Sequence, residues 1–341
     1  MLLEDYSRRE RWMTPKRNER LFNLKKSGEG KVVFVTGGDG RTGRSLSRAL
    51  VRNGYSVRAL SHDKEFMRTM PAGVVPYVGD LNDRKVLNEA CKGVDIVYHL
   101  AAIVSEYREP TKKLMEVNVA GTESVLEACR KNGVGHIIFS SSLDVYGRSR
   151  ADVLTEDSTL NPSDKYGYSK ALAERKIIEY GDKIDYTIMR TATIYGSGFE
   201  ASYFKLFKAI KSGKAYIIGD GTNNLSLINI EDVISAMLLA AEKKVSGRNV
   251  YNLSDGVKYT QEGLLNMAAD MLKAERPKRH ISQLIVNLVA KSRGLDSDEL
   301  RFLTSNRIVD ISRIKKELGF APSMDINDAA IDMVRDFISK G

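Results

Sequence analysis

Tyr166 and Lys170 stand four residues apart in the segment YGYSKALAERKII, whose pattern predicts a helix. Side chains at that spacing lie on one face of a helix, so both would point into the same cleft. An ammonium group favours the ionised form of a nearby phenol, so Lys170 should lower the pKa of Tyr166 from about 10 toward neutral pH. Such a tyrosine can exchange a proton with a hydroxyl or carbonyl oxygen while a hydride moves. Tyr168 does not fit this role, because its i+4 neighbour is Leu172.

A row of serines, Ser140 to Ser142, ends a predicted strand in the segment IIFSSSLDVYG. A hydroxyl there can donate a hydrogen bond to a substrate oxygen on which negative charge develops. Taken alone, a serine cluster is an ordinary polar strand end, and the tyrosine–lysine spacing is common on solvated helix faces. A catalytic interpretation therefore requires a fold that brings the serines and the Tyr166–Lys170 pair together.

Residues 31–43, KVVFVTGGDGRTG, join an apolar run to a glycine-rich turn and lead directly into a helical pattern, RSLSRALVRNG. A dinucleotide pyrophosphate needs this order of strand, tight turn and helix. Gly37 permits the sharp turn, Gly40 lets the backbone approach the phosphates, and Gly43 lets the helix pack on the strand. The start of the helix offers N–H groups and the positive end of its dipole to the phosphates. The segment predicts a dinucleotide-binding site.

Short β-type segments alternate with helical ones from Lys31 onward, which is the pattern of a parallel sheet with helices on both faces. We expect an α/β protein with a Rossmann-type doubly wound parallel sheet and a smaller, mostly C-terminal α/β substrate lobe. Residues 31–190 form the predicted dinucleotide-binding domain, 191–341 mainly the substrate-binding lobe, and 1–30 a charged N-terminal extension. The predicted strands are 31–36, 56–60, 74–78, 94–99, 136–140 and 184–190, and the predicted helices are 41–53, 83–92, 110–132, 164–181, 201–213, 230–244, 260–275, 279–291 and 326–340.

The composition, with 42% hydrophobic and 28% charged residues, is that of an ordinary globular protein. No apolar run approaches the roughly 18 residues of a transmembrane span, and the first thirty residues hold no apolar signal-peptide core. Cys91 and Cys129 lack metal-ligand spacing, so we expect reduced thiols in a cytoplasmic protein and no metal site. The net charge of +9 comes from scattered basic residues without a nucleic-acid recognition motif. An anionic cofactor or substrate therefore explains this charge better than nucleic acid does.

Together these segments resemble the extended short-chain dehydrogenase/reductase family, also called the NAD-dependent epimerase/dehydratase family. The resemblance runs from about Lys31 to the C-terminus and implies a homodimer that acts on a small-molecule alcohol, ketone or sugar. Its motifs fall in the family's order: TGGDGRTG (36–43), GDLND (79–83), HLAA (99–102), VNVAGT (117–122), SSSLDVYG (140–147), YGYSK (166–170), RTATIYG (190–196) and GDGTNNLSLINIEDV (219–233).

The resemblance implies a role for each matching residue. Ser142 would be the catalytic hydroxyl, Tyr166 the acid and base, and Lys170 the residue that tunes Tyr166 and binds the nicotinamide ribose. Asn118 would brace the active-site helix and a proton relay. The remaining positions would bind the cofactor: Gly37, Gly40, Arg41, Thr42 and Gly43 at the phosphates, Ser61 and His62 at the adenosine ribose, Asp80 and Leu81 at the adenine, and Leu100, Ala101 and Ala102 beneath the cofactor.

The position that selects the cofactor departs from the family's NAD pattern. Members that prefer NAD place an acid at the end of the second strand, about eighteen residues beyond the last glycine of the turn, where it binds the ribose hydroxyls. This chain has Ser61 there, and Asp63 follows two residues late. Arg41, Arg44 and His62 stand where they could surround a 2′-phosphate, which favours NADP. The alternative is that the arginines are surface charges and that Asp63 or backbone groups serve NAD.

The reaction type follows from three further departures from the family's pattern. Leu143 replaces the acid that follows the catalytic hydroxyl in dehydratases, which disfavours that reaction. Thr193 and Leu225 replace the Asn and Arg with which nucleotide-sugar members hold a diphosphate. The chain is therefore more similar to 3β-hydroxysteroid dehydrogenases, dihydroflavonol-type reductases and keto-sugar reductases. We expect an NAD(P)-dependent oxidoreductase that interconverts a secondary alcohol and a ketone.

Two alternatives remain open. An NAD-dependent nucleotide-sugar epimerase would use the same residues, with Lys205, Lys208 or Lys211 holding the diphosphate. A non-catalytic dinucleotide sensor or assembly subunit would keep the fold without needing the Ser142, Tyr166 and Lys170 set.

The segment RHISQLIVNLVAK (279–291) carries an apolar stripe at helical spacing. Such a stripe is usually core or a subunit contact, although it can also line a pocket for a lipid-like substrate or touch a membrane surface. The opposite face is polar but uncharged, so the core interpretation is favoured. The stripe consists of Ile281, Leu284, Ile285, Leu288 and Val289.

Overall fold

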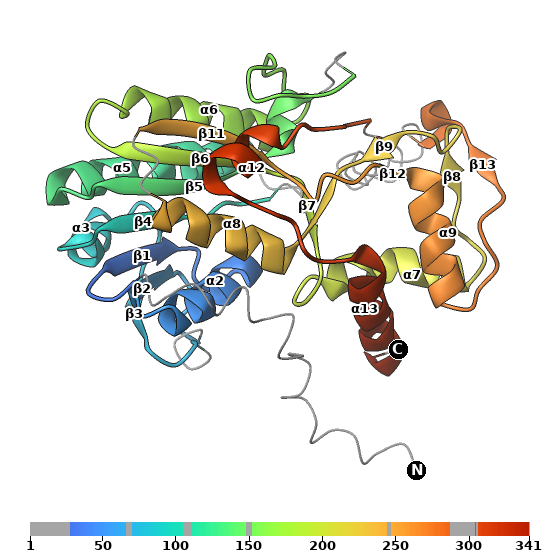
Figure 1. Ribbon diagram of the computed structural model, residues 1–341, viewed down its shortest axis with the longest axis horizontal. Helices are drawn as coiled ribbons and strands as arrows, with labels where there is room; N and C mark the ends of the chain where they lie inside the picture. The colour runs from blue at the N-terminus through green and yellow to red at the C-terminus, as the bar shows by residue number, and fades with distance from the viewer. Residues whose placement is uncertain are drawn as a thin grey trace, which may run out of the picture.

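A sheet of seven strands forms the centre of the computed structural model, in the order β11-β6-β5-β4-β1-β2-β3 (Figure 1). All neighbouring strands in it are parallel. The order reverses between β1 and β4, which is where such sheets open a ligand-binding crevice. The predicted Rossmann-type doubly wound sheet is therefore confirmed. The strands are β1 (Val32–Thr36), β2 (Ser56–Ser61), β3 (Val74–Val78), β4 (Ile96–His99), β5 (His136–Ser142), β6 (Asp185–Thr191) and β11 (Arg248–Leu253). The structure describes residues 28–65, 70–104, 111–147, 152–243, 247–286, 304 and 306–340.

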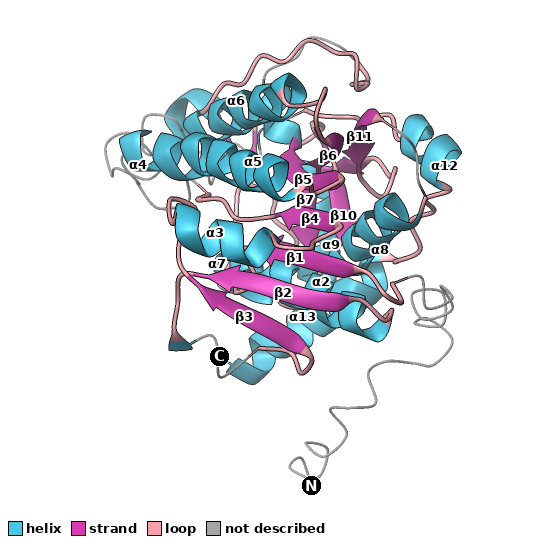
Figure 2. Ribbon diagram, turned by 90° about the vertical axis from the view of Figure 1, so that its left-hand side faces the viewer, coloured by secondary structure: helices cyan, strands magenta, loops and turns pink. Residues whose placement is uncertain are grey.

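Helices cover both faces of the sheet (Figure 2). Alternate side chains of β1 enter the two cores: Val33 and Val35 pack with the residues of α2 and α8, whereas Phe34 packs with those of α3 and α5. This alternation, apolar on both sides, is expected of a strand buried between two helical layers. One layer consists of α2 (Arg41–Arg52), α8 (Ile230–Glu242) and α12 (Ser312–Leu318), and the other of α3 (Arg84–Cys91), α5 (Gly121–Asn132) and α6 (Lys165–Glu179).

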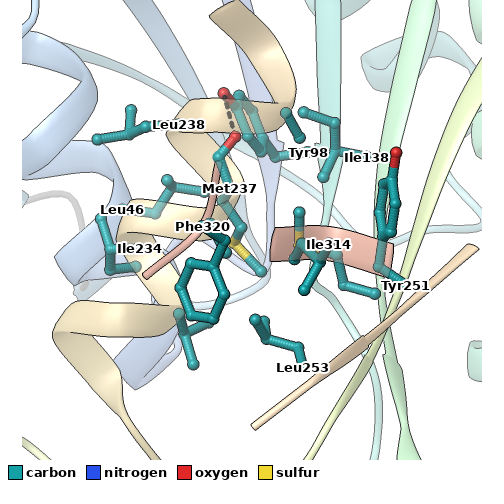
Figure 3. Packing of buried hydrophobic residues seen from close by; sticks show 14 of the residues in the cluster. Leu46, Tyr98, Ile138, Ile234, Met237, Leu238, Tyr251, Leu253, Ile314 and Phe320 are labelled. Atoms are coloured by element: carbon teal, nitrogen blue, oxygen red, sulfur yellow. Dashed lines mark hydrogen bonds between the residues drawn. The ribbon is translucent and has the colours of Figure 1, made fainter. Parts of the chain in front are cut away.

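The core beneath α8 joins residues that are far apart in the sequence (Figure 3). Tyr98 of β4 is fully buried, and its hydroxyl donates a hydrogen bond of 3.5 Å to the carbonyl oxygen of Met237 in α8. Ile314 of α12 and Phe320 just after it pack in the same cluster. Residues 312–320 thus return to the sheet domain.

A second lobe has its own core and lies to the right of the sheet in Figure 1. Phe207, Leu265 and Met333 pack together there from three helices. Those helices are α7 (Phe204–Lys211), α9 (Gln261–Met271) and α13 (Ile326–Lys340), joined by the strand pairs β7 (Thr193–Tyr195) with β10 (Leu227–Asn229), β8 (Ile217–Ile218) with β13 (His280–Ile281), and β9 (Asn224–Leu225) with β12 (Tyr259–Thr260).

Residues after 190 contribute to both lobes. The second lobe is built from residues after 190, but α8, β11 and α12 also follow 190 and belong to the sheet domain. The expected extension, residues 1–30, lies almost wholly outside the described residues, which begin at Gly28.

The predicted helix over 279–291 is wrong at its start. His280 and Ile281 form β13 and pair with Ile217 and Ile218, because the edge of β8 needs backbone partners. The expected burial of the apolar stripe is also wrong for Leu284, which is 79% exposed, and for Ile285, which is 51% exposed, whereas Ile281 is half-buried. Leu288 and Val289 lie outside the described residues.

Candidate active site

The glycine-rich turn lies between β1 and α2, against the segment that follows β4. Gly37 has φ +67°, and a Cβ placed on it would lie 2.9 Å from the backbone of Ala101. A Cβ on Gly43 would collide with the carbonyl oxygen of Gly37. Helix α2 begins after Gly40 without a side-chain cap and without an acid in its first turn. The turn can pack this closely only because glycine occupies positions 37 and 43. The backbone N–H groups at the uncapped start of α2 fit a dinucleotide pyrophosphate.

A buried hydrogen-bond chain fixes the ends of β1 and β4 together. The Thr122 hydroxyl donates to the Asn118 carbonyl oxygen at 2.6 Å, so Nε2 of His99 must donate to Thr122 at 2.9 Å. Nδ1 of His99 then accepts from the Thr36 hydroxyl at 2.8 Å. The Thr36 oxygen in turn accepts from the N–H groups of Leu100 and Ala101, each at 3.2 Å. This chain requires a neutral imidazole.

The electrostatics of His99 agree with this tautomer. Burial, with the nearby Lys170 charge, lowers the pKa of His99 to about 3. The ring therefore stays neutral at physiological pH and, through Thr36, holds Leu100 and Ala101 beside the glycine-rich turn. Sequence analysis placed Leu100, Ala101 and Ala102 beneath the cofactor but did not identify the threonine and histidine that position them.

Asn118 links the segment after β4 to the start of α6. Its amide accepts from the Ile103 N–H at 2.8 Å and donates to the Ile103 carbonyl at 2.9 Å and to the Ser169 hydroxyl at 2.9 Å. Ser169 passes the contact on to the Tyr166 carbonyl at 2.7 Å. Asn118 lies in a π-helical turn, Glu116–Ala120, which interrupts the predicted helix over 110–132. Such turns are frequent at functional sites because they redirect a side chain.

The start of α6 packs on the turn that carries Ser142. A Cβ on Gly167 would lie 2.9 Å from the backbone carbon of Asp144, so the helix can approach this turn only with glycine there. The Asp164 carboxylate caps the helix by accepting from the Gly167 N–H at 2.7 Å. Tyr166, half-buried, is the residue next to this contact. The fold therefore brings the tyrosine and the serine turn together, as a catalytic interpretation requires.

Lys170 lies one turn further along α6 and is only 2% exposed. Its ammonium nitrogen lies 4.1 Å from the centre of the Phe139 ring on β5. Burial lowers the pKa of Lys170 to about 7, and the nearby Glu174 opposes this shift. A lysine with such a pKa is unusual and typical of a functional cleft.

The Ser142 hydroxyl is held by the turn that follows it. It donates to an Asp144 carboxylate oxygen at 2.9 Å and accepts from the Asp144 N–H at 3.1 Å. The other carboxylate oxygen accepts from Arg307 at 2.6 Å, and the Arg307 side chain is 15% exposed. Sequence analysis did not identify Arg307, because it lies 163 residues after Asp144 and only the fold brings the two together.

Behind the site, Glu174 and Arg190 form a buried ion pair. Nη2 of Arg190 lies 2.8 Å from the Glu174 carboxylate, and the two side chains are 6% and 1% exposed. Ser141 donates to the same carboxylate at 2.5 Å, and Arg190 also donates to the Tyr146 hydroxyl at 2.8 Å. The pair ties α6 to β5 and β6 one turn below Lys170.

Replacing Arg190 with methionine should destabilise the protein by about 3–5 kcal/mol, because it leaves the Glu174 carboxylate buried without a cation. Urea unfolding measures this effect. Arg276→Met is the matched control. Arg276 also donates to a carboxylate through two nitrogens, but its partner Asp270 lies on the surface. That variant should unfold nearly as the parent does. Equal losses in both variants would contradict the account.

Of the residues predicted at the phosphates and the adenosine ribose, the structure directs Arg41 away from the end of β2 and keeps Arg44, Ser61 and His62 close to Asp39. Arg41 reaches the other lobe, where it donates to the Ser202 hydroxyl at 2.6 Å and lies over the Phe199 ring. Nε of Arg44 donates to the Asp39 carbonyl oxygen at 3.1 Å. Ser61 is 3% exposed at the end of β2, and His62 beside it has an exposed side chain. Thr42 lies in the first turn of α2, half-buried.

The two residues predicted at the adenine follow β3. Asp80 is exposed, and its carboxylate accepts from the Asn82 N–H at 2.7 Å. Leu81 is 5% exposed and packs against Gly121, where a Cβ would lie 2.7 Å from the leucine side chain. Leu81 therefore shapes the wall between β3 and α5.

Two further features of the described part of the chain bear on function. None of its helices has the length and apolar character needed to cross a membrane. Among the same residues, His, Cys, Asp and Glu side chains form no group of three or more that suits a metal ion.

Comparisons with known proteins fit this geometry. A family model described as the NAD dependent epimerase/dehydratase family matches residues 33–254. An Escherichia coli O157:H7 protein, N-acetyl-alpha-D-glucosaminyl-diphospho-ditrans,octacis-undecaprenol 4-epimerase, is 30% identical over 253 residues, covering 73% of this chain and 75% of the relative. A Stigmatella aurantiaca protein, 4-hydroxy-2-methyl-3-oxo-4-farnesyl-3,4-dihydroquinoline-1-oxide ketoreductase, is 29% identical over 307 residues, covering 85% of this chain and 91% of the relative.

A solved structure extends the likeness to the whole fold. MoeE5 in complex with UDP-glucose and NAD superposes with a TM-score of 0.72 at 25% identity, covering 91% of this chain and 100% of MoeE5. The known proteins therefore include both an epimerase and a ketoreductase on one scaffold. Together with the match over residues 33–254, they show that the chain belongs to the NAD-dependent epimerase/dehydratase family of extended short-chain dehydrogenases/reductases.

Proposed function

We propose that the protein is an NAD(P)-dependent oxidoreductase that interconverts a secondary alcohol and a ketone. The observation that carries the proposal is the contact between Gly167 and the Asp144 backbone, which holds Tyr166 beside the Ser142 turn. A bound nicotinamide dinucleotide would supply or accept the hydride. The glycine-rich turn and the uncapped start of α2 would hold its phosphates.

The chain's own residues divide the remaining work. The Ser142 hydroxyl turns its single proton from the Asp144 carboxylate to the substrate oxygen, while the Asp144 N–H, 3.1 Å away, keeps the serine oxygen in place. Tyr166 gives a proton to this oxygen during reduction and takes it back during oxidation. Lys170 stabilises the phenolate by its charge and binds the nicotinamide ribose. Asn118 keeps α6 in position through Ser169.

The surroundings favour a reductase over the two other reactions of the family. Leu143, where dehydratases carry an acid, is 3% exposed and packs in the core, so it supplies neither a proton nor space for one. Leu225, where nucleotide-sugar members carry an arginine, is 1% exposed and offers nothing to a diphosphate. The relative named as a ketoreductase agrees with this preference.

The alternative is an NAD-dependent nucleotide-sugar epimerase. The structural similarity to MoeE5, which was solved with UDP-glucose and NAD, supports this alternative. Epimerisation would use Ser142, Tyr166 and Lys170 in the same way and regenerate its cofactor within each cycle. It would need a cation for the diphosphate, and Lys205 and Lys208 on α7 are exposed to solvent.

Two assays separate these reactions. A reductase oxidises reduced nicotinamide in proportion to added ketone, tested with 3-oxo esters, cyclic ketones and keto-sugars. An epimerase instead gains thermal stability from UDP or dTDP at millimolar concentration, because a ligand of the native state raises the melting temperature. Stabilisation by these nucleotides, without net nicotinamide oxidation by any ketone, would overturn the proposal.

A homodimer is part of the same proposal. An apolar groove of about 560 Å³ lies on the surface between the π-helical turn and α6. Met115, Val119 and Leu172 line it, together with Tyr168, which is 51% exposed. Burial of this groove against a second copy predicts a solution mass about twice the 38.0 kDa of one chain, which light scattering measures. A monomeric mass at micromolar concentration would contradict it.

A further inference from the structure

The end of β2 lacks the acid that selects NAD in this fold, but the glycine-rich turn places a carboxylate at the same point. The Ser61 hydroxyl donates to Oδ2 of Asp39 at 2.9 Å, and Nδ1 of His62 lies 3.3 Å from the same oxygen. Ser61 is the last residue of β2 and stands at the position where other members carry the acid. Asp39 precedes it by twenty-two residues and reaches it only through the fold.

The backbone fixes this carboxylate in place. The Gly38 N–H donates to the carbonyl oxygen of Leu60 in β2 at 2.9 Å, and a Cβ on Gly38 would lie 2.7 Å from Cβ of Ala59. The turn is therefore pressed against the last residues of β2. Asp39, the next residue, has a side chain that is 19% exposed, so its carboxylate is accessible without being fully solvated. A carboxylate held in this way can accept hydrogen bonds from two neighbouring hydroxyls.

Of the three basic residues expected to surround a 2′-phosphate, Arg41 is directed elsewhere, and His62 and Arg44 both contact Asp39. Arg41 donates to Ser202 in the second lobe and lies over the Phe199 ring. Nε of Arg44 donates to the main-chain oxygen of Asp39 at 3.1 Å. A 2′-phosphate carries up to two negative charges at neutral pH and would meet the Asp39 carboxylate at short range. Like charges at that distance repel strongly in a partly buried site.

We infer that Asp39 takes the role of the missing acid and selects NAD over NADP by accepting hydrogen bonds from the adenosine ribose hydroxyls. This inference rests on the dinucleotide site of the proposed function. It reverses the preference for NADP that the arginines suggested from the sequence. Asp63, the other acid near this point, uses its carboxylate to accept from the Glu65 N–H at 2.8 Å and is a poorer candidate.

The test is a set of equilibrium titrations of NADH and NADPH against the full chain and two variants, followed by nicotinamide fluorescence. The parent should bind NADH more tightly than NADPH by about tenfold or more. Asp39→Asn keeps an acceptor for Ser61 but removes the charge, and it should lower this ratio by about tenfold or more, with tighter binding of NADPH. Asp63→Asn removes the same charge two residues beyond β2 and should leave the ratio unchanged.

The outcomes separate this inference from the proposed function. A parent that binds NADPH as tightly as NADH, or an Asp39→Asn variant with the parental ratio, overturns the role of Asp39 while leaving the dinucleotide site intact. A parent that binds neither nucleotide overturns both. A change of ratio in Asp63→Asn alone would move the role to Asp63. Because the readout is binding, loss of turnover cannot imitate any of these results.

Discussion

Replacing Tyr166 with phenylalanine is expected to lower kcat by about three orders of magnitude, since the phenol is the group that exchanges a proton with the substrate oxygen. The dissociation constant of the dinucleotide should change little, because the glycine-rich turn and the start of α2 supply the phosphate contacts. The loss should therefore fall on kcat and kcat/KM together, as expected for an interaction made in the transition state.

Tyr168→Phe is the matched control for this change. Tyr168 lies on the same helix, is 51% exposed, and has Leu172 instead of a lysine four residues later. It should keep nearly full turnover. If Tyr166→Phe keeps most of its activity, or if both variants lose it equally, the assignment of the proton-transfer residue is wrong.

Replacing Lys170 with methionine should abolish most turnover and at the same time stabilise the cofactor-free protein. The folded chain holds this lysine 2% exposed with a pKa of about 7, against 10.5 for an ordinary lysine. Below pH 7 the folded state must keep a buried ammonium ion that the unfolded chain solvates. Methionine has a similar length and packs well against the Phe139 ring. We expect the free energy of unfolding to rise by about 2–4 kcal/mol at pH 6.

The sign of this effect with pH gives its check. Between pH 7 and about 10 the unfolded chain binds a proton at this position that the folded chain does not, so the stability of the parent increases with pH through this window. The stability gap between Lys170→Met and the parent should therefore be largest at pH 6 and shrink toward pH 10. Urea unfolding at both pH values measures it. A gap that is absent at pH 6, or that widens with pH, would contradict the buried-lysine account. A substitution that increases stability but removes activity, as expected for Lys170→Met, is typical of a functional residue.

Much of the fold could be predicted from the periodicity of apolar residues and from the glycine and polar residues that bound each element. The strands from β1 to β6 are short apolar runs bounded by glycine or polar residues, and their positions agree with the predicted ranges to within a few residues. Strand β11 was not predicted, because the segment RNVYNL mixes polar and apolar residues. It forms a strand because its backbone pairs with β6. The stripe over 279–291 failed for the converse reason. Its apolar residues have helical spacing, but His280 and Ile281 form a strand because their backbone pairs with β8.

The candidate site divides in the same way. The serine row and the Tyr166–Lys170 pair were indicated by their residue types and spacing, whereas Asn118 and the choice of Ser142 came from the resemblance to the family. Arg307 acts on Asp144 across the fold and carried no local signal. His99 lies in the motif HLAA, but its partners Thr36 and Thr122 are 63 and 23 residues away, so the sequence did not show its role. Asp39 was visible in the turn, but its meeting with Ser61 depends on how the turn packs against β2. A search for acids within the glycine-rich turn, and not only at the end of the second strand, would have found it.

A reductase requires that the cofactor enter and leave its site with each turnover. The most direct test is to denature the freshly purified protein and identify any released nucleotide by mass spectrometry. We expect far less than one nucleotide per chain, and an emptied site that binds added dinucleotide reversibly. Stoichiometric NAD that survives purification and dialysis would contradict the account and point to the epimerase, whose cofactor is regenerated in place.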